Sequence, residues 1–134
     1  MINTDTTQHP LARWSAALGW TALVLVLLLQ SSSQPVIGPA APPGDPPLER
    51  EILLTAGHVV AFAVLTALWW WALSLHTGPQ RSLVLAVMVA LLISVCTELA
   101  QAAVPDRAAS WFDISVNVLV TLVTAWRIQT RSAR

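Results

Sequence analysis

The chain has 134 residues, of which 55% are hydrophobic and 10% are charged, and seven arginines balance seven acidic residues. A soluble domain carries about 25% charged residues, and such high hydrophobicity excludes a disordered tail. The single cysteine, Cys96, has no disulfide partner within the chain, and no basic patch is present to bind nucleic acid. The composition therefore predicts a small integral membrane protein.

Four apolar segments are long enough to cross a bilayer, which takes about 20 residues. They run from about Leu11 to Gln30, Ile52 to Leu75, Ser82 to Val104, and Ala108 or Trp111 to Trp126. This predicts an all-α, four-helix transmembrane bundle over residues 14–126, with tails at 1–13 and 127–134. The first segment could also be a signal peptide, but the nearest small-residue cleavage site lies well downstream of it.

Arginine placement predicts the orientation of the bundle. Five of the seven arginines fall in the two tails and in the loop between the second and third segments. By the positive-inside rule both termini should be cytoplasmic, and the loops at 31–51 and 103–110 should face outward from the inner membrane. The loop at 31–51 holds six of the nine prolines and should be an extended spacer. Pro79 and Pro105 are expected to end the second and third helices.

Tryptophan is the most abundant aromatic residue, with seven copies that mostly fall near the ends of the predicted spans. Tryptophan is enriched where a membrane meets water, because its ring is apolar and its N–H is polar. We therefore expect all seven to anchor the protein at the two membrane surfaces.

The few polar residues inside the spans gather at one depth. His58 and Glu98 each lie six positions from the outer end of their segments, or about 9 Å at the helical rise of 1.5 Å per residue. Asp113 and Asn117 lie near the outer start of the fourth segment. Ionisable side chains inside a membrane are costly and therefore need partners, water or a function.

Helical spacing places these polar residues on shared faces. Thr55 and His58 share a face with Phe62. Two longer polar stripes follow the same spacing: Ser94, Glu98 and Gln101, and then Asp113, Asn117, Thr121 and Thr124. Arg107, in the short outer loop, could reach a carboxylate. The sequence thus predicts an outward-facing polar pocket lined by His58, Glu98, Gln101, Arg107, Asp113 and Asn117.

At these residues the chain resembles the VanZ-like family of small membrane proteins. The shared pattern is a His followed four residues later by an aromatic (His58, Phe62), then Glu98-Leu-Ala-Gln101, Pro105-Asp-Arg107 and Asp113-Ile-Ser-Val-Asn117. The resemblance covers about residues 14–126. It implies a role in the cell envelope, and the family takes its name from an accessory protein associated with tolerance to the glycopeptide teicoplanin. The chain departs from the family at Leu54-Thr55, where Asp-Lys is common, and at Val120 and Thr124, where Gly is common.

Simpler structural roles compete with a functional site. His58 could be a histidine paired with Glu98 or Asn117, and Glu98 could be tied to Arg107 or His58. Ser110-Trp-Phe-Asp113 matches a capping box, in which Asp113 stabilises the start of the last helix. Glu98 is expected to have no capping role. Cys96 is most simply a small apolar residue, and the arginines after Trp126 are a topology signal.

Three functions remain open from the sequence. The first is a non-enzymatic envelope protein that binds a lipid-linked or peptide ligand, or a membrane protein partner. The second is a membrane hydrolase or transferase in which His58, Glu98 and Asp113 supply ligands for a divalent ion. The third is a proton-coupled carrier that uses the His–Glu pair. No cofactor and no catalytic residue is assigned. The expected partners are membrane lipids, and a homo-oligomer stays open because a dimer could compensate for the few helices of a carrier.

Overall fold

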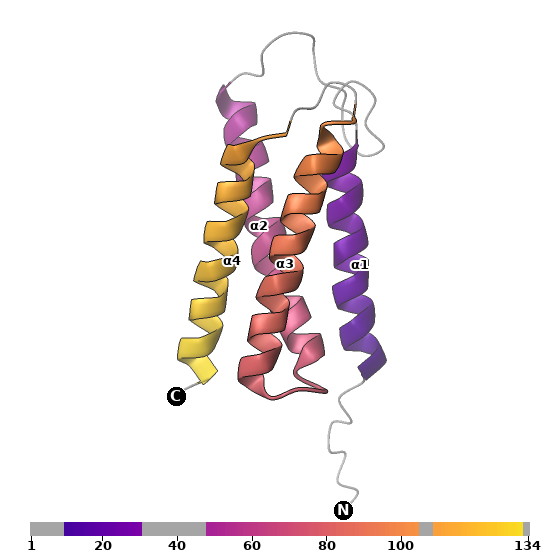
Figure 1. Cartoon of the computed structure of the whole chain (residues 1–134), viewed down its shortest axis with the longest axis vertical. Coiled ribbons are helices and arrows are strands. Elements are labelled where there is room, and N and C mark those ends of the chain that lie inside the picture. Colours follow the sequence, from indigo (N-terminus) through magenta and orange to yellow (C-terminus); the bar gives the residue numbers. More distant parts are fainter. Residues whose placement is uncertain (1–9, 31–47, 105–108, 133–134) are drawn as a thin grey trace, which may run out of the picture.

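The computed structural model describes residues 10–30, 48–104 and 109–132. This part of the chain forms four α-helices: α1 (Pro10–Leu29), α2 (Leu48–Leu73), α3 (Pro79–Gln101) and α4 (Trp111–Ser132). Each contains a segment long and apolar enough to cross a membrane. The helices run side by side along one axis, and α1 begins at the end of the bundle where α4 ends (Figure 1). The predicted all-α fold with four membrane-crossing helices is therefore confirmed.

Two helices extend further than hydropathy predicted. α2 begins at Leu48, inside the segment expected to be a spacer, and carries Glu49 and Glu51 in its first turn. Acidic residues stabilise a helix start because they face the positive end of the helix dipole. α4 continues past Trp126 as far as Ser132, into the expected tail. Hydropathy marks the apolar part of a helix and does not show where the backbone leaves the helical conformation.

Pro79 does not end the second helix as predicted. α2 already ends at Leu73, and Pro79 is the first residue of α3, directly after the N-cap residue Gly78. Proline suits this position because the first N–H groups of a helix have no partner within the helix. Pro105 lies outside the described residues, as does most of the predicted spacer loop.

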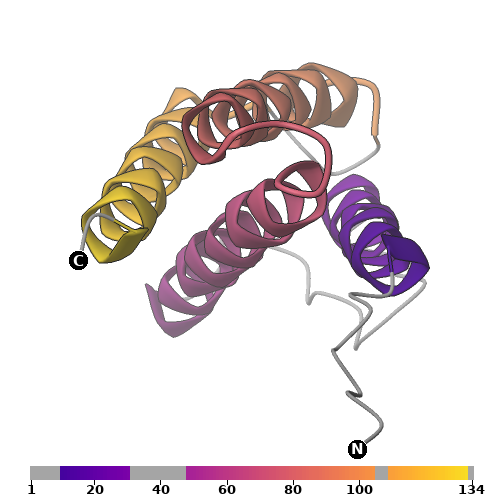
Figure 2. The ribbon, with the colours of Figure 1, turned by 90° about the horizontal axis from the view of Figure 1, so that it is seen from below.

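α2 is the central helix of the bundle. It contacts each of the other three helices, and α3 contacts α1 and α4. Among the described residues, α1 and α4 do not contact each other, and Figure 2 shows α2 between them. A residue on α2 can therefore meet residues from every other helix, which is the position His58 occupies.

The bundle is polar inside and apolar outside. α3 shows this best: its buried residues are small or polar, whereas Met88, Leu92 and Leu99 are each more than 60% exposed. In a membrane, lipid chains cover exposed apolar residues, and small residues allow helices to approach closely. The apolar core is correspondingly small and centres on Phe62 and Leu65 of α2.

Two tryptophans join α1 to α2. Trp20 of α1 donates its indole N–H to the carbonyl oxygen of Ala61 at 3.0 Å. Trp69 of α2 donates to the hydroxyl of Thr21, also at 3.0 Å. Surface anchoring therefore does not account for all seven tryptophans, because these two hold helices together. Trp111 and Trp126 of α4 are strongly exposed and retain the expected anchoring role as a prediction.

Candidate functional site

The polar residues of α2, α3 and α4 meet at the end of the bundle opposite the termini, which we call the site end. Asn117 of α4 is fully buried and lies at the centre of this network. Its side-chain oxygen is 3.1 Å from Nδ1 of His58 on α2, and its amide nitrogen donates to the hydroxyl of Ser94 on α3 at 3.0 Å. One amide thus connects three helices.

The Asn117 amide also determines the tautomer of His58. Because the amide nitrogen donates to Ser94, the amide oxygen faces the imidazole and can only accept a hydrogen bond. Nδ1 of His58 must then carry the proton, which leaves the lone pair of a neutral ring on Nε2. His58 is 6% exposed and its ring lies parallel to that of Phe62.

Glu98 and Ser110 connect α3 to the start of α4. The backbone N–H of Ser110 donates to Oε2 of Glu98 at 2.9 Å, and the hydroxyl of Ser110 accepts the backbone N–H of Asp113 at 3.2 Å. Ser110 therefore caps α4 as the sequence predicted. In a capping box the Asp113 carboxylate would bind the Ser110 N–H, but here Glu98 does so. The expectation that Glu98 has no capping role was wrong, because helix packing brings a carboxylate from another helix to this N–H.

Gln101 has a structural partner at the site end. Its side chain is almost fully buried and donates to the carbonyl oxygen of Leu28 at 2.9 Å. Leu28 lies in the last turn of α1, where carbonyl groups have no partner within the helix. Gln101 therefore ties the end of α3 to the end of α1. Arg107, the remaining predicted site residue, lies outside the described residues.

His58, Glu98 and Asp113 converge on one point. Each offers one potential ligand atom, and these atoms lie within 4.8 Å of one another. Tetrahedral zinc with bonds of about 2.1 Å holds its ligand atoms about 3.4 Å apart, so these atoms would have to approach one another by up to about 1.4 Å to complete such a set. A metal-binding imidazole is usually oriented by a hydrogen bond from its other ring nitrogen, and the bond from Nδ1 of His58 to Asn117 is of this kind. The same groups could instead exchange protons as an acid–base set.

An open cavity of about 730 Å³ lies beside these residues, between the first turns of α2 and α4. Glu51 and Asp113 are its two acidic lining residues, and Thr55 and Ser110 add hydroxyl groups. Most of the remaining lining is apolar, including Leu48, Ile52, Leu54, Val59 and Phe112. A smaller cavity of about 190 Å³ lies between α1 and α2, and His58 is one of its lining residues.

The cluster differs in form from the predicted pocket. Glu98 and Asn117 are fully buried and His58 nearly so, while Asp113 is half-buried and lines the large cavity. The network is thus largely buried, and it borders the large cavity at Asp113 and the smaller one at His58. Sequence reasoning left Ser94 and Ser110 out of the site, although their positions in the polar stripe and in the capping box were recognised.

These features define a multi-pass membrane protein with four helices and a buried polar network at one end. Beyond this class, the chain matches no protein-family model, no curated protein and no solved structure.

Proposed function

We propose that the chain is a VanZ-like envelope protein that binds a lipid-linked ligand at the large cavity and acts without catalysing a reaction. The observation that carries this proposal is the cavity itself, which places acidic and hydroxyl groups beside a larger apolar wall. Such a surface suits an amphiphile whose chain contacts apolar residues and whose headgroup contacts the polar ones. The hydrogen bonds of Asn117 would fix the relative positions of α2 and α4, the two helices that line the cavity.

The acidic residues of the cavity indicate which ligand headgroups it can bind. Glu51 of α2 and Asp113 of α4 both line it. Two carboxylates favour hydrogen-bond donors, such as the hydroxyl groups of a sugar or the amino groups of a peptide, over a phosphate. We therefore assign recognition to the sugar or peptide part of an envelope ligand. The proposed consequence is tolerance to glycopeptide antibiotics, which act on such envelope components.

Matched acidic residues on α2 provide the test. Glu51 lines the cavity, whereas Glu49, two residues earlier, is exposed and does not line it. The full chain would be expressed in a teicoplanin-sensitive bacterium, and the inhibitory concentration measured. We expect the wild type and Glu49→Gln to raise it, and Glu51→Gln and Asp113→Asn to abolish the increase. Ser115→Ala, on an exposed face of α4, is the control for Asp113.

Two results would contradict this proposal. If the wild type left the inhibitory concentration unchanged at a confirmed expression level, the tolerance role would be wrong. If the purified wild type converted any component of an envelope lipid extract, detected by mass spectrometry, the non-enzymatic role would be wrong.

The convergence of His58, Glu98 and Asp113 favours a second candidate, a metal-dependent membrane hydrolase or transferase. A bound divalent ion would activate water next to the cavity, and the ligand would then be a substrate. Elemental analysis of the purified full chain tests this candidate. It predicts about one zinc or manganese ion per chain, lost in His58→Gln. A well-folded protein with no stoichiometric metal after purification without chelators and addition of either ion would rule it out.

A further inference from the structure

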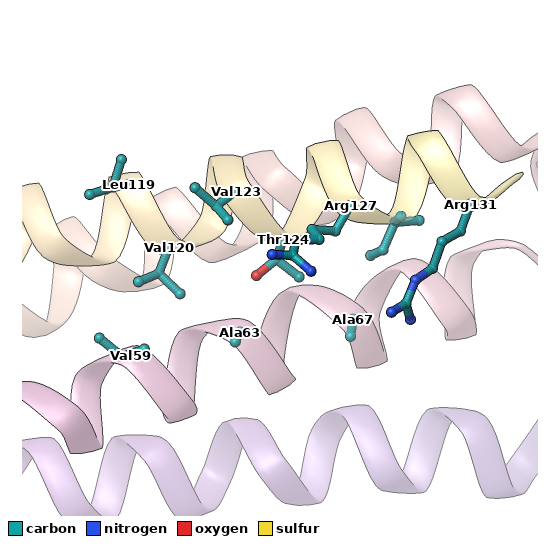
Figure 3. A pocket seen from close by; sticks show the side chains of 10 residues that line it. Val59, Ala63, Ala67, Leu119, Val120, Val123, Thr124, Arg127 and Arg131 are labelled. Atoms are coloured by element: carbon teal, nitrogen blue, oxygen red, sulfur yellow. The ribbon is translucent and has the colours of Figure 1, made fainter. Parts of the chain in front are cut away.

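A second surface of the molecule lies away from the polar network, on the flank shared by α2 and α4. An open groove of about 550 Å³ runs between these helices (Figure 3). Val59, Ala63 and Ala67 form its wall on α2 at spacings of four residues, so small side chains line one face of that helix. Apolar residues of α4 form the opposite wall.

The groove becomes basic toward the end of the bundle where the termini lie. Arg127 and Arg131 of α4 line this part, and Figure 3 shows their side chains turned from α4 toward α2. Thr124, one turn earlier on the same face, adds a hydroxyl group. The groove thus has a long apolar section and a cationic section with hydrogen-bond donors.

No described carboxylate can neutralise these arginines. The four acidic residues in the described part of the chain are Glu49, Glu51, Glu98 and Asp113, and all lie at the site end. Arg127 and Arg131 are four residues apart on one helix, a spacing at which like charges repel each other. An anion placed between them would remove this repulsion.

We propose that this groove is a binding site for one anionic phospholipid. An acyl chain would lie along the alanine-lined section, and the phosphate would accept hydrogen bonds from Arg127, Arg131 and Thr124. Arginine suits this role because its planar guanidinium donates two parallel hydrogen bonds to a phosphate. Basic pockets between membrane helices bind anionic lipid headgroups in this way. A lipid with net negative charge is preferred because its headgroup carries no cation to compete with the arginines.

Charge also argues against a second copy of the chain in this groove. Two copies inserted in the same direction would bring Arg127 and Arg131 of each against those of the other. The described acidic residues would be at the far end of both copies and could not compensate. Like charges facing each other across an interface oppose association. A lipid phosphate supplies the opposite charge that a second copy lacks.

Native mass spectrometry of the full chain released from detergent tests the proposal. The probes are dioleoyl-phosphatidylglycerol, which is anionic, and dioleoyl-phosphatidylcholine, which is zwitterionic. We expect one phosphatidylglycerol to be retained per chain, in preference to phosphatidylcholine. Arg127→Gln and Arg131→Gln should each weaken its retention about fivefold, and the double variant about 30-fold.

Two further variants separate charge from shape. Arg81→Gln removes an arginine from the start of α3, at the same end of the bundle but outside the groove, and should leave lipid retention unchanged. Ala67→Leu fills the groove without changing its charge and should lower retention of both lipids. Elution volume and helix content are measured for each variant; if Ala67→Leu does not fold, the arginine variants decide the question.

Three outcomes would overturn the assignment. Equal retention of phosphatidylglycerol and phosphatidylcholine would show that the net charge of the lipid does not contribute to binding. An equal loss in Arg81→Gln and Arg127→Gln would show a general attraction to basic residues in place of a site. A lipid-free dimer that Ala67→Leu dissociates would show that a second copy occupies the groove.

Discussion

Glu98, near the end of α3, accepts a hydrogen bond at 2.9 Å from the backbone N–H of Ser110, the residue that caps α4. This contact spans the short connection between the two helices, so the end of one helix fixes the beginning of the next. Asp113 would supply the carboxylate in a local capping box. Since Glu98 takes that place, Asp113 is available to line the large cavity.

The first prediction separates the capping function of Glu98 from its charge. Glu98→Ala removes the acceptor of a backbone N–H and should lower the free energy of unfolding by about 1–3 kcal/mol. Glu98→Gln keeps a side-chain oxygen at the same distance from the backbone and should lose less than half of that. Unfolding of the purified protein in mixed micelles, followed by circular dichroism, measures both. Gln129→Ala, on an exposed face of α4, is the control. Equal losses of unfolding free energy for Glu98→Gln and Glu98→Ala would contradict the capping role.

The second prediction concerns the tautomer of His58. Since Asn117 presents its oxygen to Nδ1, we expect the wild-type ring to be protonated at Nδ1 at neutral pH. Nitrogen NMR of protein labelled at histidine distinguishes the two ring nitrogens. In Asn117→Leu, which has no acceptor there, the preference should disappear. Ser115→Ala is the control because Ser115 is exposed on α4. A ring protonated at Nε2 in the wild type would contradict the proposed network.

The four helices could be predicted from the sequence because lipid-exposed helices are apolar over a length set by the bilayer. The residues at which the helices begin and end were less predictable. The first turn of α2 contains Glu49 and Glu51, which hydropathy counts as loop, and the last turns of α4 contain Arg127 and Arg131. Both segments are polar, yet both are helical because the charges suit the helix dipole. Pro79 was misassigned because proline favours the first position of a helix as well as the region after its end.

The members of the polar network were predictable, and the pair of His58 with Asn117 was one of the two anticipated for that histidine, but the other pairings were not predicted. Helical spacing indicated that His58, Glu98, Asp113 and Asn117 would turn inward at one depth. Which atoms meet depends on the rotation of each helix about its axis, and a single sequence does not determine this rotation. Asn117 consequently bonds to Ser94, and Glu98 bonds to a backbone group of Ser110. The spacing of polar residues along each helix did not predict either contact.

The third prediction compares two buried hydroxyl groups. Thr121 of α4 is fully buried, and its hydroxyl oxygen has no hydrogen-bond partner among the described residues. Thr121→Val replaces this hydroxyl with a methyl group of similar size and should raise the free energy of unfolding by about 1 kcal/mol. Ser94→Ala removes the acceptor of Asn117 and should lower the same quantity by about 1–3 kcal/mol. The same micelle unfolding experiment measures both, and a destabilised Thr121→Val would indicate that this hydroxyl has a partner.

The fourth prediction is the direction in which the bundle crosses the membrane. Arg13, Arg81, Arg127 and Arg131 lie at the end of the bundle where the termini are, and the described acidic residues lie at the site end. The positive-inside rule therefore predicts cytoplasmic termini. A C-terminal green fluorescent protein should fluoresce in bacterial cells, and a C-terminal alkaline phosphatase should be inactive, because it folds only outside the cytoplasm. The variant Arg81→Glu, Arg127→Glu, Arg131→Glu should give a mixed orientation, whereas Glu49→Gln should not. An active phosphatase fusion of the wild type would place the polar network on the cytoplasmic side. That orientation would contradict the proposed binding of outer-leaflet ligands. The proposed binding of an anionic phospholipid between α2 and α4 would still stand.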